Sequence, residues 1–433
     1  MYNTRIETMP LEELRVLQNS RLSSVVKRLY NNVPFYKNQF DTAGIHPEDI
    51  QSVDDLSKIP FTKKSDLRDN YPYQMFAKPL NEVRRIHASS GTTGKSTVVG
   101  YTQNDLAIFD EVNARSLYCA GAREGMKLHN AYGYGLFTGG LGIHGGASKL
   151  GMAVIPVSGG MTDRQLTILQ DFGPEVICCT PSYAQTISDE LAKKGIDPED
   201  LALKYAVLGA EPWTEAIRNQ VEDGLKIKAS NIYGLSEIIG PGVSQEDVDE
   251  RGTGCYIWED HFFPEVVDKN TGKPLPYGEE GVLVFTTLTK EALPLLRYWT
   301  NDICSINYDK NAKRTHIKMS NIKGRADDML IIRGVNLFHT QVEEIIHQIE
   351  GLSPNYRLII DKNGAMDHIT LEVETVNGIE KNNLEFVKMV GMKMKNNIGI
   401  SMDVELKIKN SIPRSQGGKL SRILDRRGVY NQN

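Results

Sequence analysis

Residues 87–96 have the sequence His87-Ala88-Ser89-Ser90-Gly91-Thr92-Thr93-Gly94-Lys95-Ser96, which is rich in glycine and hydroxyl side chains. Glycines allow the main-chain N–H groups of a loop to turn inward and form an anion-binding nest. The hydroxyl groups add further donors, and Lys95 adds a positive charge. The segment therefore predicts a loop that binds a polyphosphate.

Two alternatives exist for this loop. The Walker A sequence of P-loop NTPases, G-x-x-x-x-G-K-[ST], aligns with Gly94-Lys95-Ser96, but Ser89 then stands where that sequence needs its first glycine. Because that glycine permits the tight turn out of the preceding strand, the mismatch disfavours a P-loop NTPase. The second alternative is a Ser/Thr/Gly turn with a purely structural role.

Four further motifs follow the loop along the chain. They are Asn231-Ile232-Tyr233-Gly234-Leu235-Ser236-Glu237, Arg297-Tyr298-Trp299-Thr300-Asn301-Asp302, Gly324-Arg325-Ala326-Asp327-Asp328 and Pro413-Arg414-Ser415-Gln416-Gly417-Gly418-Lys419. Each alone has an ordinary structural interpretation, since a lone aspartate is usually solvated and a Gly-Gly-Lys near a terminus is usually a turn. In this order, however, the five segments resemble the adenylate-forming superfamily, the acyl-CoA synthetases and their relatives.

This resemblance implies a role for each motif. The residues implied in catalysis are Thr92, Ser236 at the α-phosphate, Glu237 as the Mg²⁺ ligand and Lys419 as the adenylation lysine. The residues implied in nucleotide binding are Ser89, Ser90, Gly91, Thr92, Thr93, Gly94, Lys95, Gly209, Ala210, Glu211, Pro212, Asn231, Tyr233 (on adenine), Gly234, Asp302 (on both ribose hydroxyls), Arg325, Arg333 and Gly334. Asp327 is implied as the hinge between the two domains.

Several other segments resemble the phenylacetate–coenzyme A ligase family within this superfamily. They are Tyr132-Gly133-Tyr134-Gly135-Leu136-Phe137-Thr138-Gly139-Gly140, Trp258-Glu259-Asp260-His261-Phe262, Thr287-Leu288-Thr289-Lys290-Glu291-Ala292 and Arg333-Gly334-Val335-Asn336. The resemblance covers nearly the whole chain and implies an ATP-dependent aryl-acid–CoA ligase. In that reaction the acid and ATP give an acyl-adenylate and pyrophosphate, and coenzyme A then gives the acyl-CoA and AMP. It also implies Mg²⁺ as cofactor and a homodimer.

The acid pocket is expected to combine aromatic rings with small residues, as a slot for a flat aryl group requires. Its expected lining is Tyr132, Tyr134, Phe137, Gly145 and Ile238, beside the segment 209–212. Ordinary core packing is the alternative for the three rings. Gly145 follows His144 where relatives have tyrosine, so we expect a larger pocket. Together with His339, Asn301 and Ser96, which also depart from the family pattern, it weakens the assignment of phenylacetate itself.

A zinc site is a further candidate. Some relatives hold a structural zinc with a Cys-x-Cys-Gly-Arg-Thr-His segment, whereas the corresponding residues here, Lys310–His316, lack both cysteines. Cys255, His261, Cys304 and His316 lie in the same region of the sequence and could form a Cys₂His₂ site. The alternative is that the cysteines are buried free thiols, which are common in cores.

Hydrophobic periodicity predicts an α/β fold. An amphipathic helix is expected over residues 11–30. Short apolar runs alternate with helix-like stretches from about residue 150, which predicts βαβ units and a parallel sheet covered on both faces. The runs are Ala153–Val157, Val176–Thr180, Tyr205–Leu208 and Ile227–Ile232. Strands expected at 266–267, 282–288 and 303–308, separated by Gly/Pro turns, predict a smaller β-rich subdomain.

A domain boundary is expected where the polar residues 324–328 precede an apolar run. Residues 1–325 would form the large N-terminal adenylate-forming domain with the ATP and aryl-acid site. Residues 326–433 would form a small, mobile α+β domain that brings the adenylation lysine. Within it, Thr340-Gln341-Val342-Glu343 matches a capping box and predicts the start of a helix.

The composition is that of a globular protein with more than one domain. The chain has 433 residues, of which 40% are hydrophobic, and this excludes a disordered chain. A net charge of −5 disfavours nucleic acid as the main partner. No apolar run suits a membrane span, residues 1–10 do not resemble a signal peptide, and the five cysteines do not suggest a disulfide framework. We therefore expect a cytoplasmic protein.

Two functions remain as alternatives to the ligase at this stage. One is an adenylyltransferase that resembles the enzyme transferring AMP to a deazaflavin coenzyme and uses no coenzyme A. The other is a non-catalytic nucleotide-binding sensor. The presence of Glu237, Asp302 and Lys419 disfavours the sensor, because a protein without the chemistry need not retain the lysine.

Overall fold

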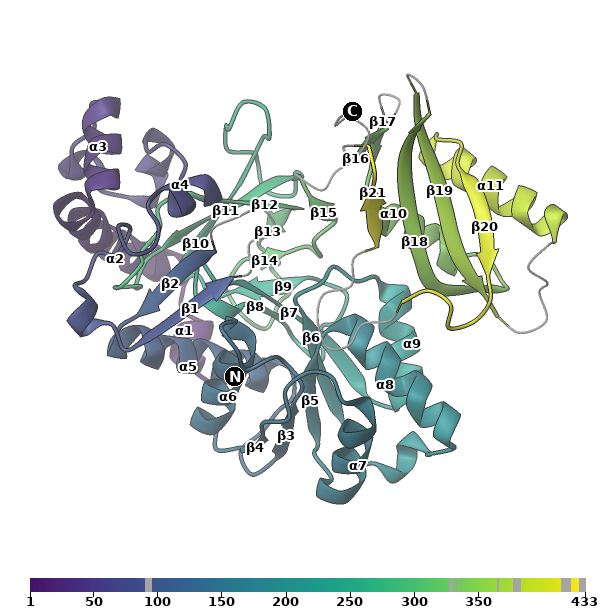
Figure 1. The fold of residues 1–433 in the computed structure, drawn as a ribbon. Helices are drawn as coiled ribbons and strands as arrows, with labels where there is room; N and C mark the ends of the chain where they lie inside the picture. The colour runs from purple at the N-terminus through teal and green to yellow at the C-terminus, as the bar shows by residue number, and fades with distance from the viewer. Residues whose placement is uncertain are drawn as a thin grey trace.

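The structure is a computed structural model of the chain, and it describes residues 1–89, 96–326, 330–332, 335–363, 366–376, 383–413 and 422–427. A large N-terminal part packs beside a smaller C-terminal part, which carries the strands β18–β20 and the helix α11 at the right of Figure 1. Among the described residues, no helix has both the length and the apolar character needed to cross a membrane.

Helices begin the chain, and the amphipathic helix expected over residues 11–30 is confirmed as α2. These helices are α1 (Thr4–Glu7), α2 (Leu11–Asn32), α3 (Pro34–Ala43) and α4 (Lys64–Asp69), with short 3₁₀ turns at Pro47–Asp49, Val53–Lys58 and Leu80–Glu82. The residues of α2 that are buried recur every three or four positions, as one face of a helix requires. Pro34 begins α3, and Gly44, with φ of 67°, ends it.

The centre of the N-terminal part is a nine-stranded mixed sheet with the strand order β13-β14-β9-β8-β7-β6-β5-β3-β4. Its strands are β3 (Lys127–Asn130), β4 (Ala153–Ile155), β5 (Val176–Cys179), β6 (Tyr205–Gly209), β7 (Lys228–Leu235), β8 (Gly240–Glu246), β9 (Cys255–Ile257), β13 (Ile306–Asn307) and β14 (Lys318–Met319). The strands β4, β3, β5, β6 and β7 are parallel, so the predicted βαβ arrangement is confirmed.

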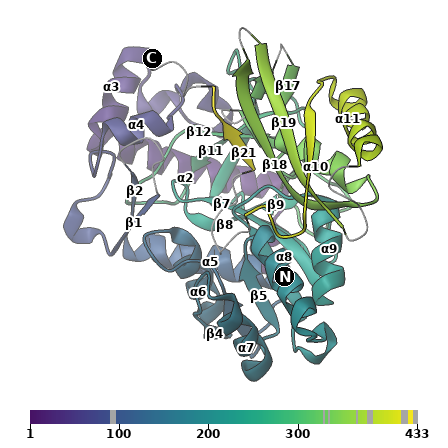
Figure 2. The same cartoon turned by 45° about the vertical axis from the view of Figure 1, so that its right-hand side comes forward.

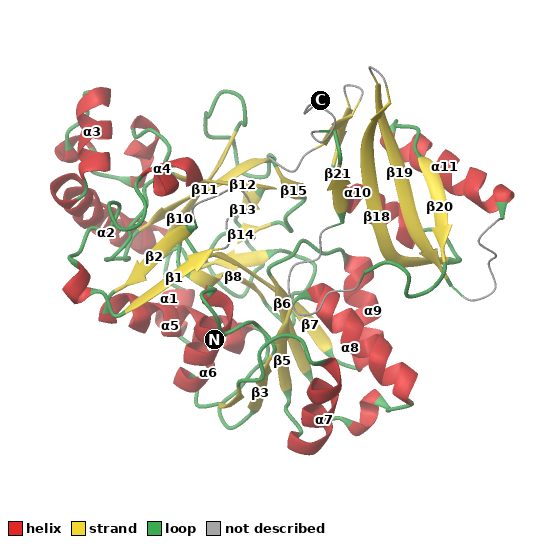
Figure 3. Cartoon of the chain, viewed as in Figure 1, coloured by secondary structure: helices red, strands yellow, loops and turns green. Residues whose placement is uncertain are grey.

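Helices cover both faces of this sheet (Figure 3). They are α5 (Gln103–Cys119), α6 (Thr138–Lys149), α7 (Thr162–Phe172), α8 (Pro181–Lys194), the 3₁₀ turn Pro198–Asp200 and α9 (Glu215–Leu225). Alternate residues of β5 separate the two cores: Ile177 and Cys179 pack with α7, α8 and α9, whereas Val176 and Cys178 pack with α5 and α6. A strand buried on both faces has no polar side, which explains its continuous apolar sequence.

A second, antiparallel sheet confirms the predicted β-rich subdomain. Its order is β10-β11-β12-β15, from β10 (Phe262–Val267), β11 (Gly281–Thr287), β12 (Tyr298–Cys304) and β15 (Gly324–Arg325). The expectation of one strand over 303–308 is wrong, since β12 ends at Cys304 and β13, which belongs to the nine-stranded sheet, begins at Ile306. A separate hairpin consists of β1 (Arg85–Ser89) and β2 (Thr97–Tyr101).

The C-terminal part has its own apolar core and a four-stranded sheet of order β20-β19-β18-β21 (Figure 2). Its elements are β16 (Leu330–Ile332), β17 (Val335–Leu337), α10 (His339–His347), β18 (Leu352–Asn363), β19 (Met366–Thr375), α11 (Leu384–Ile398), β20 (Asp403–Lys407) and β21 (Ile423–Asp425). The capping box predicted at Thr340 is wrong: α10 already begins at His339, and the Thr340 hydroxyl donates to the carbonyl oxygen of Lys323, 2.6 Å away.

Candidate active site

The predicted phosphate loop is carried by the β1–β2 hairpin. Ser89 pairs with Thr97 at the end of this hairpin where β1 and β2 are connected, and the buried hydroxyl oxygens of both have no hydrogen-bond partner among the described residues. Residues Ser90 to Lys95, which include Thr92, lie outside the described residues. The strands beside this segment are β1, which ends at Ser89, and β2, which begins at Thr97.

The same hairpin holds the segment that was predicted to contact the acid. The carbonyl oxygen of Leu136 accepts two hydrogen bonds from β1, one from the Ala88 N–H at 3.0 Å and one from His87 Nδ1 at 3.0 Å. Burial lowers the pKa of His87, so the neutral ring is favoured. The strand β1, which precedes the predicted phosphate loop, is thus bonded directly to Leu136, within the segment 132–140.

Three predicted nucleotide-binding residues come together where the two sheets meet, one on β7 and two on β12 and β15. The hydroxyl of Tyr233 on β7 donates to Asp302 Oδ2 on β12 at 2.6 Å. Arg325, paired with Asp302 in the β12–β15 ladder, has a guanidinium nitrogen 3.9 Å from Asp302 Oδ1. Burial, together with the Asp302 charge, raises the pKa of Tyr233. A carboxylate between a phenol and a guanidinium group is a suitable acceptor for ribose hydroxyls.

Small residues allow the main chain to approach closely at two other predicted positions. A Cβ on Gly234 would lie 1.9 Å from the carbonyl oxygen of Gly240, and one on Gly209 would lie 2.2 Å from that of Ile232. Ala210, the next residue, has a φ of 70°, which is uncommon outside glycine. Glycine is therefore required at the end of β6, where Gly209 approaches β7, and near the end of β7, where Gly234 approaches the start of β8.

The remaining residues of these segments are held by hydrogen bonds. The Asn231 N–H donates to Glu246 Oε2 at 2.9 Å, and the Asn231 side chain donates to Asn321 at 3.3 Å. Glu211 accepts from the Ser182 hydroxyl at 2.9 Å. Pro212 is partly buried beside it. These bonds fix the middle of β7 and the turn that follows β6, where the predicted nucleotide-binding residues lie.

Glu237 and Ser236 occupy the turn between β7 and β8. The Ser236 hydroxyl lies 3.0 Å from that of Thr138, at the start of α6. The Glu237 carboxylate is 5% exposed and forms an ion pair with Lys64 of α4, with Nζ 3.3 Å from Oε1. Sequence reasoning missed Lys64, since no motif distinguishes it from the other lysines.

A second lysine, which follows Glu237 in the sequence, also contacts this residue. The Lys290 ammonium group is buried, and it donates to the main-chain oxygen of Glu237 at 3.2 Å. Burial lowers the pKa of Lys290 to about 8, while Asp105 and Glu237 act in the opposite direction. The sequence contained a signal, since Lys290 lies in a segment that resembles the family, but the lysine itself was not singled out.

The residues predicted to line the acid pocket differ in their burial. Tyr132 is buried, and the Tyr134 hydroxyl accepts from the Asn130 amide at 2.8 Å and lies 3.2 Å from His144 Nδ1. Phe137 is 51% exposed, whereas Ile238 is buried in the core. Phe137 is thus free to meet a ligand, and Ile238 packs as a core residue.

The structure gives a reason for glycine at position 145 that differs from the expected enlargement of the pocket. A Cβ at this position would lie 1.9 Å from Asp110 Oδ1 on α5, so a side chain would displace Asp110 and would not enter open space. Its neighbours Gly142 and Gly146 meet Phe109 and Asn113 of α5 in the same way, at 2.3 Å each. The structure therefore indicates that these glycines let α5 and α6 pack closely.

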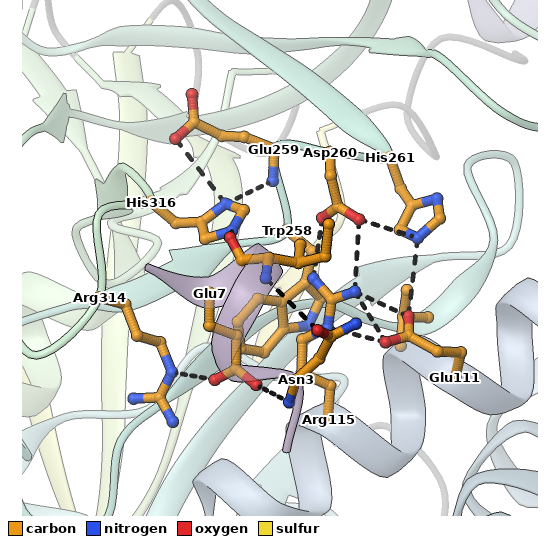
Figure 4. A network of polar contacts seen from close by, with 12 residues as sticks. Asn3, Glu7, Glu111, Arg115, Trp258, Glu259, Asp260, His261, Arg314 and His316 are labelled. Carbon is orange, nitrogen blue, oxygen red and sulfur yellow. Dashed lines mark hydrogen bonds and ion pairs between the residues drawn. The ribbon is translucent and has the colours of Figure 1, made fainter. Parts of the chain in front are cut away.

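The predicted zinc site is wrong, because its histidines are already bonded to protein groups (Figure 4). His316 Nδ1 accepts from the Glu259 N–H at 3.0 Å, and its Nε2 donates to the Ile6 carbonyl oxygen at 3.2 Å. His261 Nδ1 lies 2.8 Å from the Thr289 hydroxyl, and its Nε2 lies 3.1 Å from Asp260. No nitrogen of either ring is left for a metal.

The two cysteines of the predicted site are also apart from one another in the fold. Cys255 lies on β9, with its sulfur 3.7 Å from the Asn231 carbonyl oxygen, and Cys304 lies at the end of β12 in the other sheet. Burial raises the pKa of both thiols, which keeps them protonated. The part of the chain that the structure describes, which includes all four residues, contains no cluster of His, Cys, Asp and Glu suited to a metal ion.

Four predicted residues of the C-terminal part lie outside the described residues: Asp327, Arg333, Gly334 and Lys419. Contacts between the two parts are nevertheless described. The Thr214 hydroxyl at the start of α9 donates to Glu343 Oε1 of α10 at 3.3 Å. Glu343 is buried and also interacts with Arg422 and Tyr356, at 3.3 Å each. This carboxylate connects the C-terminal part to the start of α9 in the N-terminal part.

Comparison with known families agrees with this geometry. The family described as "AMP-binding enzyme" matches residues 12–288, and "AMP-binding enzyme C-terminal domain" matches residues 334–427. Fold and site together thus define an AMP-binding enzyme.

The relatives narrow this class. A phenylacetate–coenzyme A ligase from Thermus thermophilus is 57% identical over 444 residues, covering 99% of this chain and 100% of that protein. The ligase of the same name from Escherichia coli is 48% identical, covering 98% of this chain and 97% of that protein. The chain belongs to the phenylacetate–coenzyme A ligase family and is an ATP-dependent, AMP-forming acid–CoA ligase that acts through an acyl-adenylate. The adenylyltransferase, sensor and NTPase alternatives receive no support.

Solved structures of one relative distinguish two domain arrangements. The chain matches 2-hydroxyisobutyryl-CoA ligase in the postadenylation state with a TM-score of 0.91 at 26% identity, covering 98% of this chain and 92% of that one. The TM-score against the same ligase in the thioesterification state is 0.73 at 27% identity, with the same coverage. The two parts of this chain are therefore arranged as in the postadenylation state.

Proposed function

We propose that the acid is an aryl acid of the size of phenylacetate and that the product is its CoA thioester. The observation that supports this most strongly is the identity of 48–57%, over nearly the whole chain, with ligases named for phenylacetate. The aromatic side chains of Tyr132 and Tyr134, together with the exposed ring of Phe137, suit a flat apolar group.

The first half-reaction activates the acid. A carboxylate is a poor electrophile, and joining it to AMP supplies a leaving group. We assign the ATP phosphates to the loop 89–95, the ribose to Asp302 and Arg325, and the α-phosphate to Ser236. Lys419 would donate to the charge that develops on the α-phosphate, which is the kind of preorganised contact that lowers such barriers.

Glu237 is the candidate ligand for Mg²⁺. Its carboxylate provides the hard oxygen that Mg²⁺ prefers, and Lys64, its ion-pair partner, is on a flexible, half-exposed side chain that can turn to a phosphate instead. When bound, Mg²⁺ would neutralise charge on the ATP phosphates. The chain's own contribution is to hold the Glu237 carboxylate in one place.

The second half-reaction would follow a rotation of the C-terminal part about Asp327. Removal of Lys419 from the site would free one face of the acyl-adenylate for the thiol of coenzyme A. A homodimer and a cytoplasmic location stay predictions, which gel filtration and cell fractionation can check.

A panel of acids tests the proposed substrate. Phenylacetate, benzoate, 3-phenylpropionate, hexanoate and 2-hydroxyisobutyrate are each assayed for pyrophosphate release and for CoA-dependent AMP formation. We expect kcat/KM to be highest for phenylacetate or a close analogue. A preference for the aliphatic acids would overturn the aryl-acid assignment while leaving acid–CoA ligation intact.

A further inference from the structure

Lys290 is a buried cation whose position carries a cost in stability. The side chain is 1% exposed, and the acceptor described for its ammonium group is a neutral main-chain oxygen, that of Glu237. Moving an ammonium group out of water is unfavourable unless an anion is in direct contact. Methionine of similar volume would fill the same space without this cost, so a lysine here indicates a functional role.

The segment around Lys290 is held unusually firmly. The buried carboxylate of Asp105 accepts from the N–H groups of Glu291 at 2.7 Å and Ala292 at 2.9 Å. The N–H of Leu288 donates to the His261 carbonyl oxygen at 2.8 Å, and His261 also contacts the Thr289 hydroxyl. Bonds on both sides of Lys290 thus fix its main chain relative to α5.

The ammonium group and its aromatic neighbour hold the turn that presents Glu237. Lys290 Nζ lies 5.0 Å from the centre of the Tyr101 ring and bonds the oxygen of Glu237. The Tyr101 hydroxyl donates to the oxygen of Ile239, two residues later, at 2.8 Å. The carbonyl groups on both sides of Ile238 are therefore fixed by buried donors from elsewhere in the fold.

We propose that Lys290 is a positioning residue for the metal-binding carboxylate: it orients the Glu237 turn so that the side chain can hold the divalent cation that accompanies ATP. This inference rests on the proposed role of Glu237. Residues that orient a metal ligand commonly contribute 10- to 100-fold to metal affinity or activity. Lys290 supports adenylation and has no part in the attack of the thiol.

The experiment compares Lys290→Met and Glu237→Gln with the wild type. Affinity for Mn²⁺, used as a paramagnetic probe, is measured by electron paramagnetic resonance in the presence of a non-reactive ATP analogue. For Lys290→Met we expect Mn²⁺ affinity and the adenylation rate to fall by about 10- to 100-fold. Thioester formation from supplied phenylacetyl-adenylate should stay within about threefold.

Lys318→Met is the matched control, since Lys318 is also buried but forms ion pairs with Glu250 and Asp309 away from the site. It should lower the unfolding midpoint and leave Mn²⁺ affinity unchanged. If Lys290→Met does not fold, Tyr101→Phe tests the same turn and must lower Mn²⁺ affinity.

Two outcomes would overturn the inference. One is unchanged Mn²⁺ affinity in Lys290→Met while Glu237→Gln loses it. The other is an equal loss in both half-reactions with a lower unfolding midpoint. Unchanged Mn²⁺ affinity in Glu237→Gln would instead contradict the proposed role of Glu237. The experiment therefore distinguishes a failure of the Lys290 inference from a failure of the proposed function.

Discussion

Asp302 is the residue at which three motifs of the sequence meet, since Tyr233 and Arg325 both contact its carboxylate. Asp302→Ala should weaken ATP binding by about tenfold or more, because a charge-assisted hydrogen bond contributes about 1.5–3 kcal/mol. Calorimetric titration of the folded variant measures this. Tyr233→Phe is the control, since it removes one donor to Asp302 and keeps the carboxylate, and it should have a smaller effect. If the ATP affinity of Asp302→Ala equals that of the wild type, Asp302 does not bind the nucleotide.

Glu259 makes stability depend on pH. Burial raises the pKa of this carboxyl group to about 7, although its oxygens accept from Tyr308 and Ile317. Because the folded pKa lies above the ordinary value, the native state binds the proton more tightly, and stability should decrease as pH rises from about 5 to 7.

Glu259→Gln, which resembles the protonated group, should therefore remove this decrease. Relative to the wild type, we expect little change in the free energy of unfolding at pH 5 and a gain of about 1–3 kcal/mol at pH 8. Denaturant titrations at the two pH values check this. Parallel pH profiles for the two proteins would contradict it.

At the scale of elements, the packing of α6 on α5 depends on glycine. A Cβ at Gly146 would meet the main chain of α5, 2.7 Å from the carbonyl carbon of Asn113. We expect Gly146→Ala to destabilise the protein by about 1–3 kcal/mol, because overpacking against a rigid main chain outweighs the gain of about 1 kcal/mol in helix propensity.

Gly139→Ala in the same helix is the control. Its Cβ would contact Tyr132 at an ordinary 3.7 Å, so it should be neutral or stabilising. Denaturant unfolding of both variants distinguishes packing from propensity: equal stabilisation of both would mean that α5 and α6 can separate at no cost.

At the scale of the whole molecule, the Thr214–Glu343 hydrogen bond joins the two parts in the postadenylation arrangement. Thr214→Val should slow the adenylation half-reaction by about two- to tenfold relative to thioester formation, because it removes one donor to a buried carboxylate. The valine also loses the N-cap of α9, but that affects stability and not the ratio of the two rates. Thr214→Ser should retain the wild-type ratio. A ratio that is the same in both variants would show that this bond does not influence the domain arrangement.

Lys419 tests the two-conformation mechanism itself. Loss of one preorganised donor to a developing charge costs about 10²–10³ in rate, so Lys419→Ala should strongly reduce adenylation. Thioester formation from supplied acyl-adenylate should be much less affected. Single-turnover measurements of the two half-reactions decide this, and equal losses in both would leave a static site as the explanation.

The sequence alone was sufficient for the fold class and the chemistry because both depend on local features. Periodic apolar runs predicted α2 and the parallel strands β4 to β7, and the order of short motifs predicted adenylation. The motif residues Tyr233, Asp302 and Arg325 each lie within a short motif on a strand of its own, β7, β12 and β15 respectively. Such positions are encoded by a few neighbouring residues.

Other features depend on residues that are distant in the sequence, and only the tertiary structure decided them. The direction of a Cβ at Gly145, toward Asp110 and away from open space, follows from how two helices pack. His261 and His316 share a region with the cysteines, but their nitrogens bond protein groups instead of a metal. Lys64 meets Glu237 across more than a hundred residues of sequence, and Lys290 meets it across 53. Because burial and long-range contacts determine how a charged side chain behaves, no local pattern contained this information.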